Sequence, residues 1–350
     1  MTSADASPVA HSAASEAKEL IPHVYAQIEA DYWHAESKLY RDAWKDGENL
    51  SQPAFNWGVG VMLSALNGSA RFSPEIAARL PVYLQSNRLY WNQRSPVAGF
   101  DVLPNPGGID RYYDDNAWMV IALVESYEIT QDVQWLDLAE QALLYVASGE
   151  DEKLGGGIYW RESDKASKNT CSNTPSAVAA LVVYKHRKKP EYRAMAERWL
   201  RWTLTHLQDP TDGLMWDNMS LDGKIEKTKW SYNSALTIRA QAALEKEGET
   251  FPISAKKQWE SAWEYWFLGK KGMLSHGRFA HLLLETGLEL GWVSSEDQLT
   301  LVRALRKYGE PHAWRFGPDW DKPFVPGSRA ELIDQASVLR GLALIAQQGD

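Results

Sequence analysis

The feature that most constrains the fold is a regular succession of apolar segments with helical spacing, recurring from near residue 16 to the end of the chain. In the first segment Leu20, Val24, Ile28 and Tyr32 follow one another at four-residue intervals, so one face of a helix is apolar. No convincing alternation of apolar and polar residues, as in a strand, interrupts the series. The expected helices cover residues 16–33, 53–66, 74–91, 116–130, 133–147, 175–186, 190–207, 230–245, 254–266, 277–290, 295–308 and 331–347.

Twelve helices make six hairpins, and long loops rich in Gly and Trp precede alternate helices. The economical arrangement is an all-α closed ring of hairpins, with inner helices packed inside outer ones. The loops before the inner helices then converge on one cleft. We expect a single domain over residues 15–350, because rings of this size commonly fold as one unit. Residues 1–14 are small, polar and without period, which predicts a disordered or tag-like N-terminus.

The segment Tyr112-Tyr113-Asp114-Asp115-Asn116-Ala117-Trp118 places two adjacent carboxylates at the start of an apolar helix. One Asp at such a place is commonly an N-cap, which accepts a hydrogen bond from a free backbone N–H. A second adjacent Asp adds like-charge repulsion, and the flanking aromatic rings suit a sugar. From spacing alone, both structural capping and catalysis are open.

Adjacent residues on a helical turn can hold their carboxyl groups about 5 to 6 Å apart, the separation found in retaining glycosidases; inverting enzymes need about 6.5 to 9.5 Å. Two close carboxylates also resist simultaneous ionisation. One then keeps its proton as a general acid, and the other stays charged as a nucleophile. This argument favours retention but does not assign the two roles.

Three other places carry aromatic rings, amides or a cation at the start of a helix or in the loop before it. We interpret their side chains as candidate sugar contacts, with packing or a tight turn as the alternative for each. Together with Tyr112 and Tyr113, the candidates are Asn56, Trp57, Trp160 after the triple glycine of residues 155–157, Lys168, Asn169, Asn173, Trp230, Tyr232 and Asn233.

Several other functions find no support in the sequence. The net charge of −9 and dispersed basic residues argue against nucleic acid as a partner, and no apolar run approaches the roughly 18 residues of a membrane span. No zinc, calcium-loop, phosphate-loop or Gly-x-Ser-x-Gly motif occurs, so we expect no metal and no cofactor. The single cysteine, Cys171, is interpreted as a partly buried spectator.

The chain resembles glycoside hydrolase family 76, the α-1,6-mannanases and related fungal cell-wall mannan enzymes. The heptapeptide at residues 112–118 is similar to the family's catalytic motif, and support comes from residues 155–160, 168–173, 230–233 and 334–337. The likeness covers most of residues 56–346. It implies an (α/α)6 toroid that hydrolyses α-1,6-mannosidic bonds with retention, endo-acting on α-mannan or manno-oligosaccharides. By match of position, Asp114 is the nucleophile and Asp115 the acid/base.

The resemblance leaves other properties open. We expect a monomer without a membrane or nucleic-acid partner. Family members usually carry export signals, and no such signal is recognised in this sequence. The resemblance implies a secreted or periplasmic protein, and a cytoplasmic location is the alternative. The alternatives in function are a transglycosylase, which shares the covalent mechanism, and a catalytically silent mannan-binding protein. Sugar epimerases and unsaturated-uronide hydrolases use the same ring of helices, so fold alone does not decide the reaction.

Overall fold

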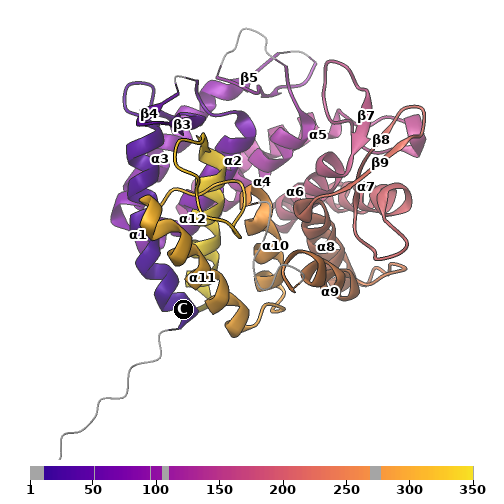
Figure 1. Ribbon diagram of the computed structural model, residues 1–350. Coiled ribbons are helices and arrows are strands. Elements are labelled where there is room, and N and C mark those ends of the chain that lie inside the picture. The colour runs from indigo at the N-terminus through magenta and orange to yellow at the C-terminus, as the bar shows by residue number, and fades with distance from the viewer. Residues whose placement is uncertain (1–11, 51, 95, 105–109, 269–276, 350) are drawn as a thin grey trace, which may run out of the picture.

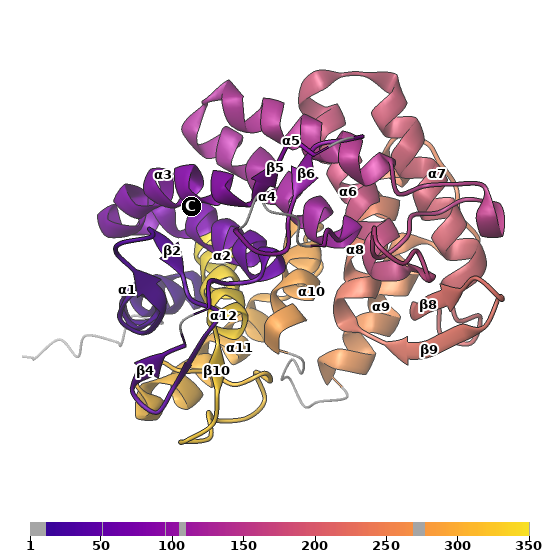
Figure 2. The same ribbon diagram turned by 90° about the horizontal axis from the view of Figure 1, so that it is seen from above.

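The computed structural model describes residues 12–50, 52–94, 96–104, 110–268 and 277–349. These residues form twelve α-helices in an inner and an outer ring (Figures 1 and 2). The predicted all-α (α/α)6 toroid is confirmed. None of the helices in the described part is both long and apolar enough to cross a bilayer. The first helix begins at Ala13, two residues inside the stretch expected to be disordered; residues 1–11 lie outside the described part.

The inner ring consists of the even-numbered helices, and consecutive members pack against one another. Its last helix packs against both its predecessor and the first inner helix, which closes the ring. The inner helices are α2 (Asn56–Ser69), α4 (Tyr113–Thr130), α6 (Thr170–Arg187), α8 (Ser231–Lys246), α10 (Gly277–Glu289) and α12 (Leu332–Ala346).

The outer helices cover this ring from outside. Four inner helices pack against the outer helix that follows each of them in sequence, and the last inner helix packs against the first outer one. The outer helix that follows α10 packs mainly against the first outer helix instead. The outer helices are α1 (Ala13–Tyr32), α3 (Pro74–Asn87), α5 (Val133–Ala147), α7 (Pro190–Leu207), α9 (Ala255–Trp266) and α11 (Ser295–Gly309).

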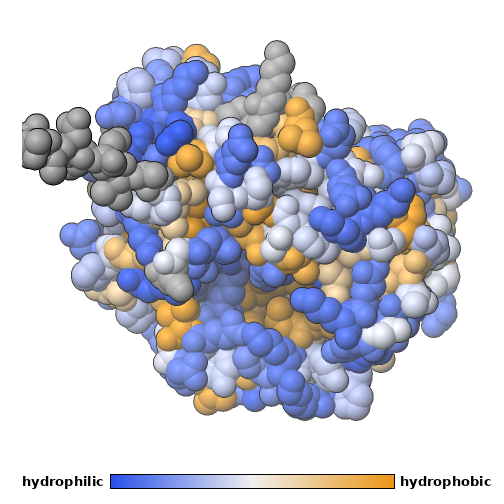
Figure 3. All heavy atoms as spheres, turned by 90° about the horizontal axis from the view of Figure 1, so that it is seen from below, coloured by the Kyte–Doolittle hydropathy of each residue, from blue (hydrophilic) through white to orange (hydrophobic). Residues whose placement is uncertain are grey.

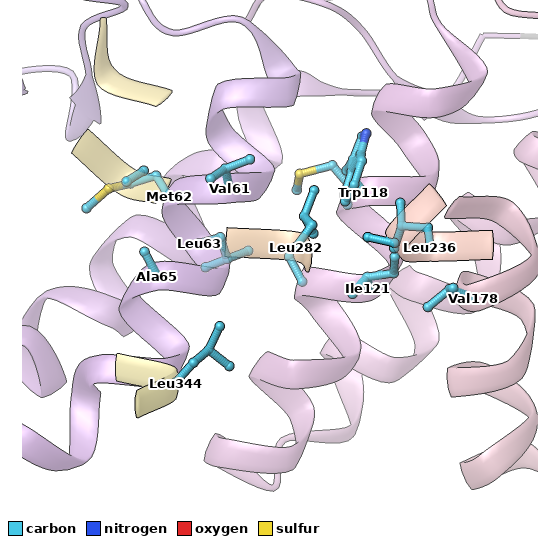
Figure 4. Packing of buried hydrophobic residues seen from close by; sticks show 14 of the residues in the cluster. Val61, Met62, Leu63, Ala65, Trp118, Ile121, Val178, Leu236, Leu282 and Leu344 are labelled. Carbon is cyan, nitrogen blue, oxygen red and sulfur yellow. The ribbon is translucent and has the colours of Figure 1, made fainter. Parts of the chain in front are cut away.

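The core fills both the centre of the inner ring and the space between the inner and outer rings. Figure 4 shows side chains from all six inner helices directed toward a common centre, among them Leu63, Ile121, Leu236, Leu282 and Leu344. All five are buried. Burying each such side chain contributes roughly 1.5–3 kcal/mol, so the apolar contacts of these residues are a large contribution to the stability of the ring.

The two rings differ in how their helices begin. Five outer helices have a Ser or Asp at the N-cap whose side chain accepts a hydrogen bond from a first-turn N–H: Ser12, Ser73, Asp132, Ser254 and Ser294. Inner helices α2, α4, α6, α8 and α12 have no such bond at the N-cap. Their first-turn N–H groups, which carry the positive end of the helix dipole, are therefore not satisfied by a cap side chain.

A different device fixes the loops to three inner helices. Four residues after the N-cap, an amide side chain accepts a hydrogen bond from a backbone N–H of the preceding loop and donates to the carbonyl of that same loop residue. Asn116 bonds Phe100 in this way at 2.7 and 3.0 Å, Asn173 bonds Ile158, and Gln335 bonds Phe316. We call these three residues the amide clamps.

Short strands occupy the loops at the end where the inner helices begin. They are β1 (Trp33–His34), β2 (Leu39–Tyr40), β3 (Ala43–Lys45), β4 (Glu48–Asn49), β5 (Trp91–Asn92), β6 (Gly99–Phe100), β7 (Ser167–Asn169), β8 (Trp216–Ser220), β9 (Ile225–Lys229) and β10 (Ala330–Glu331). All their pairings are antiparallel; β7, β8 and β9 form one sheet in that order, and β10, β3 and β4 another.

The expectation that no strand interrupts the helices is therefore wrong for the loops. The hairpin of β8 and β9 has only Met219 buried, so neither face gives the apolar alternation that marks a strand in sequence. Four helix starts also differ from expectation by three residues or more, among them α1, which begins at Ala13 rather than residue 16, and α2, which begins at Asn56 rather than residue 53. Helix α4 begins at Tyr113 rather than residue 116, and α6 begins at Thr170 and accommodates Pro175 in its second turn.

The opposite end of the ring, where the inner helices finish, is also hollowed, with hydrophobic residues visible inside the hollow (Figure 3). A cavity of about 410 Å³ there lies between the ends of α6 and α8. Beside it, Arg340 of α12 bonds Glu125 of α4 at 2.6 Å, Glu285 of α10 at 2.9 Å and the Ser64 carbonyl of α2 at 2.9 Å. Arg239 of α8 also pairs with Glu285, at 3.1 Å.

Candidate active site

A cleft of about 620 Å³ opens where the inner helices begin. Most of its lining comes from the first turns of α2, α4, α6, α8 and α10 and from the loops and strands next to them. The lining residues are Phe55, Trp57, Val102, Tyr112, Asp114, Asp115, Trp118, Trp160, Ser167, Asn169, Cys171, Asp217, Asn218, Trp230, Tyr232 and Phe279.

The two adjacent carboxylates lie in the first turn of α4 and face this cleft. The N-cap of α4 is Tyr112, and no side chain makes a capping bond there, so neither Asp114 nor Asp115 acts as the N-cap. Asp114 Oδ2 accepts a hydrogen bond from Trp160 Nε1 at 3.0 Å. No Lys or Arg in the described part of the chain forms an ion pair with either carboxylate. Their charge is therefore controlled by burial and by neutral donors.

The pKa values of the two carboxyls are both raised, but to different extents. Burial raises the pKa of Asp114, while hydrogen bonds from the Asp115 backbone N–H, the Trp160 indole and the Cys171 thiol lower it again. Burial and the neighbouring charge of Asp114 both raise the pKa of Asp115 well above its usual range, and no donor among the residues that the structure describes compensates for them. When one proton is shared by this pair, Asp115 is the better place for it.

One wall of the cleft, made by α2, α8 and α10, is lined by aromatic rings. Phe279 stacks on Trp57 with ring centroids 5.4 Å apart and on Tyr232 at 4.2 Å, and it meets Trp230 edge-on at 5.9 Å. We call Trp57, Phe279 and Tyr232 the ring stack. Near the Asp pair, Tyr112 and Trp160 meet edge-on at 5.2 Å. Flat apolar faces beside hydroxyl and indole edges suit a sugar, which has apolar C–H faces and a polar rim.

The structure brings eight of the thirteen predicted site residues to the cleft: Asp114, Asp115, Tyr112, Trp57, Trp160, Asn169, Trp230 and Tyr232. The other five lie outside its lining, and three of them, Lys168, Asn173 and Tyr113, make structural contacts instead.

Lys168 and Asn173 require the clearest correction. The Lys168 ammonium is buried and donates to the Asp151 carboxylate at 2.7 Å and to the carbonyls of residues 151, 153 and 156, which leaves no donor for a sugar. Asn173 is an amide clamp. Both residues hold the glycine-rich loop of residues 155–157 in place rather than line the cleft.

Tyr113, Asn56 and Asn233 are also buried away from the lining. The ring of Tyr113 stacks on Tyr145 at 5.1 Å, which makes it part of the packing between α4 and α5. Asn56 is the first residue of α2 and has no exposed surface. Asn233 is equally buried, and its amide lies beside the Asp217 carboxylate, whose pKa it lowers against the effect of burial.

Eight of the sixteen lining residues were not predicted as site residues, and three of them, Asp217, Cys171 and Phe279, add a carboxylate, a thiol and an aromatic ring. Asp217, near the start of β8, adds a third carboxylate, and burial raises its pKa. Cys171 was interpreted as a spectator, yet it lies in the cleft, and burial beside Asp114 raises the pKa of its thiol. Phe279 has no local signal. No group of three or more His, Cys, Asp or Glu in the described part could hold a metal ion.

Known protein families and solved structures were compared with the chain. The profile of glycosyl hydrolase family 76 matches residues 18–297. A family 76 α-mannanase from Bacteroides thetaiotaomicron is similar in structure, with a TM-score of 0.85 and 24% identity over 95% of this chain and 96% of that one.

More distant structures share the fold. An α-1,6-mannanase from Salegentibacter sp. HEL1_6, inactivated at two consecutive aspartates and bound to α-1,6-mannotriose, has a TM-score of 0.75 and 20% identity over 95% of this chain and 99% of that one. A cellobiose 2-epimerase from Spirochaeta thermophila has a TM-score of 0.70 and 13% identity over 95% and 98%. A search of curated proteins finds no match. The profile spans most of the chain and includes the Asp pair, and the chain therefore belongs to glycosyl hydrolase family 76.

Proposed function

We propose that this chain is a retaining endo-α-1,6-mannanase in which Asp114 is the nucleophile and Asp115 the acid/base. The observation that carries the proposal is the unequal environment of the two carboxyls: Asp114 accepts a hydrogen bond from the neutral Trp160 indole, whereas Asp115 receives no donor from the described residues and lies beside a negative charge. This inequality favours an ionised Asp114 and a protonated Asp115 before substrate binds.

The reaction then takes two steps. Asp114 attacks the anomeric carbon and forms a glycosyl ester, while the bond from that carbon to the leaving O6 breaks and Asp115 gives its proton to O6. Asp115, now charged, removes a proton from water, whose oxygen attacks the same carbon and releases Asp114. Two inversions give net retention, so the first product is the α-anomer.

Mannan as the substrate and the α-1,6 linkage are proposed from the family and from the fold neighbours. The Salegentibacter enzyme, named an α-1,6-mannanase, was made inactive at two consecutive aspartates, and this chain has two consecutive aspartates in its cleft. The aromatic walls of the cleft are consistent with a sugar polymer. Endo action follows the resemblance to the family.

The test is incubation with linear α-1,6-mannan, with reducing ends and product anomer followed by proton NMR. We expect initial release of the α-anomer and a loss of about 10³-fold or more in Asp114→Asn. Asp137→Asn, on the exposed face of α5, is the matched control and should keep full activity. Initial release of the β-anomer would contradict retention, and normal turnover by Asp114→Asn would contradict the assignment.

The two roles can be separated with azide. In Asp115→Asn, an aryl α-mannobioside with a good leaving group needs no acid, so azide should take the place of water and give the α-mannosyl azide. In Asp114→Ala, azide should replace the missing nucleophile and give the β-mannosyl azide. The opposite pattern would mean that the roles are exchanged. Longer products in the presence of acceptor sugar would show that transfer competes with hydrolysis.

A further inference from the structure

Trp160 differs from the buried tryptophans of this chain in where its ring and its polar atom lie. It is 40% exposed, and its ring lines the cleft. Its only side-chain polar atom, Nε1, donates to Asp114 Oδ2 at 3.0 Å. The residue was predicted as a sugar contact, but that function needs only the ring and does not explain the bond to the carboxylate.

The backbone around Trp160 fixes the indole relative to α4. The Trp160 carbonyl accepts from the N–H of Tyr113, the first residue of α4, at 3.0 Å, and the Trp160 N–H donates to the Ser167 carbonyl at 3.2 Å. Tyr112 and Arg161 form a β-bridge beside it. The donor and the start of α4 are therefore held by the same short network, and the indole N–H is in place before substrate arrives.

The kind of donor also matters. An indole N–H is neutral and does not titrate in the working range, so it stabilises the Asp114 anion without adding a counter-charge. A Lys or Arg at the same place would stabilise the anion more strongly in the ground state and would also favour ionisation of the adjacent Asp115, which must keep its proton. A neutral donor directed at Asp114 alone therefore favours ionisation of Asp114 without favouring ionisation of Asp115.

We propose that Trp160 is a positioning residue for the nucleophile: its indole N–H orients Asp114 and keeps that carboxylate ionised while Asp115 holds the proton. The inference rests on the proposed roles of the Asp pair. It assigns Trp160 a function in the chemical step in addition to any contact with sugar.

Trp160→Phe removes the donor and keeps an aromatic ring, and a second variant replaces Trp160 by 3-benzothienylalanine, which has the shape of tryptophan with sulfur in place of N–H. We expect kcat to fall by about 10- to 100-fold in both, as for loss of a hydrogen bond to a charged group, with KM changed little. The pKa of Asp114 rises when a donor is lost, so the acidic limb of kcat/KM should move to higher pH.

Trp202→Phe is the matched control. Trp202 also donates through Nε1, but to the Leu154 carbonyl at 2.9 Å outside the cleft, so its loss should leave the pH profile unchanged. Thermal melts followed by circular dichroism show that each variant is folded.

The outcomes separate this inference from the proposed function. If the unaltered protein does not cleave mannan, or Asp114→Asn is fully active, the proposed function fails and the inference with it. If those two results are as expected but the benzothienylalanine variant keeps its kcat and pH profile, only the inference is overturned. A rise in KM with unchanged kcat would overturn it as well, because Trp160 would then be a sugar platform alone.

Discussion

Lys168 and Asn169 illustrate what decides function for a single residue. The sequence suggested both as sugar contacts, but they are neighbours in β7, and successive side chains of a strand point to opposite faces. Asn169 therefore reaches the cleft while Lys168 enters the glycine-rich loop. The residue types were informative, and their directions depended on a strand that the sequence did not reveal.

Replacing Lys168 by Met should destabilise the protein by about 2–3 kcal/mol, because three carbonyls and a carboxylate lose their buried donor. Urea denaturation measures this loss, and Lys153→Met, an exposed residue of the same loop, should cost close to nothing. A variant with unchanged stability and a raised KM for mannan would instead support a direct sugar contact.

At the scale of elements, all twelve helices were predictable from apolar periodicity, and the Asp pair was predictable because it precedes such a segment. The beginnings of α4 and α6 were not, since they depend on loop backbone held by the amide clamps. Asp217 was missed because β8 carries no apolar alternation. Phe279 reaches the cleft only because ring closure brings α10 to the same end as α2 and α8.

The amide clamps predict a larger loss of stability than a single hydrogen bond at the equivalent position does. Asn116→Ala, Asn173→Ala and Gln335→Ala should each lower the free energy of unfolding by about 2–4 kcal/mol, because each leaves buried backbone groups without a partner. Ser234→Ala, at the equivalent place on α8, removes one bond to the Met215 N–H at 3.1 Å and should cost only about 1 kcal/mol. Urea denaturation of the four variants ranks their free energies of unfolding. Equal losses in all four would mean that the number of hydrogen bonds removed does not determine the loss of stability.

At the scale of the whole molecule, the hydrogen bonds and ion pairs that link Arg340 to Ser64, Glu125 and Glu285, and Arg239 to Glu285, join five of the six inner helices at the end opposite the candidate active site. Arg340 and Arg239 lower the pKa of Glu285 against the effect of burial. A carboxyl whose pKa is lower in the folded than in the unfolded protein stabilises the fold fully at pH values above the unfolded-state pKa, which is about 4.3 for Glu. This contribution to the free energy of unfolding is lost as the pH falls toward the folded-state pKa.

Arg340→Met should therefore destabilise the ring by about 3–5 kcal/mol at pH 8, because buried carboxylates lose their cation. The loss should be smaller near pH 5, where those carboxyls can accept protons. Denaturation at the two pH values measures the difference, and the pH profile of mannan cleavage by the folded fraction should not change. A loss independent of pH would argue that packing rather than charge is responsible.

The ring stack of Trp57, Phe279 and Tyr232 joins side chains of three inner helices that begin at the cleft. Each ring restricts the rotamers of the next before any sugar arrives. Ordering a flexible side chain on binding costs roughly 0.5–1.5 kcal/mol of conformational entropy. In the ring stack this entropy is already lost when the protein folds. The wall is thus preorganised, and a sugar that lies against it keeps more of its contact energy as affinity.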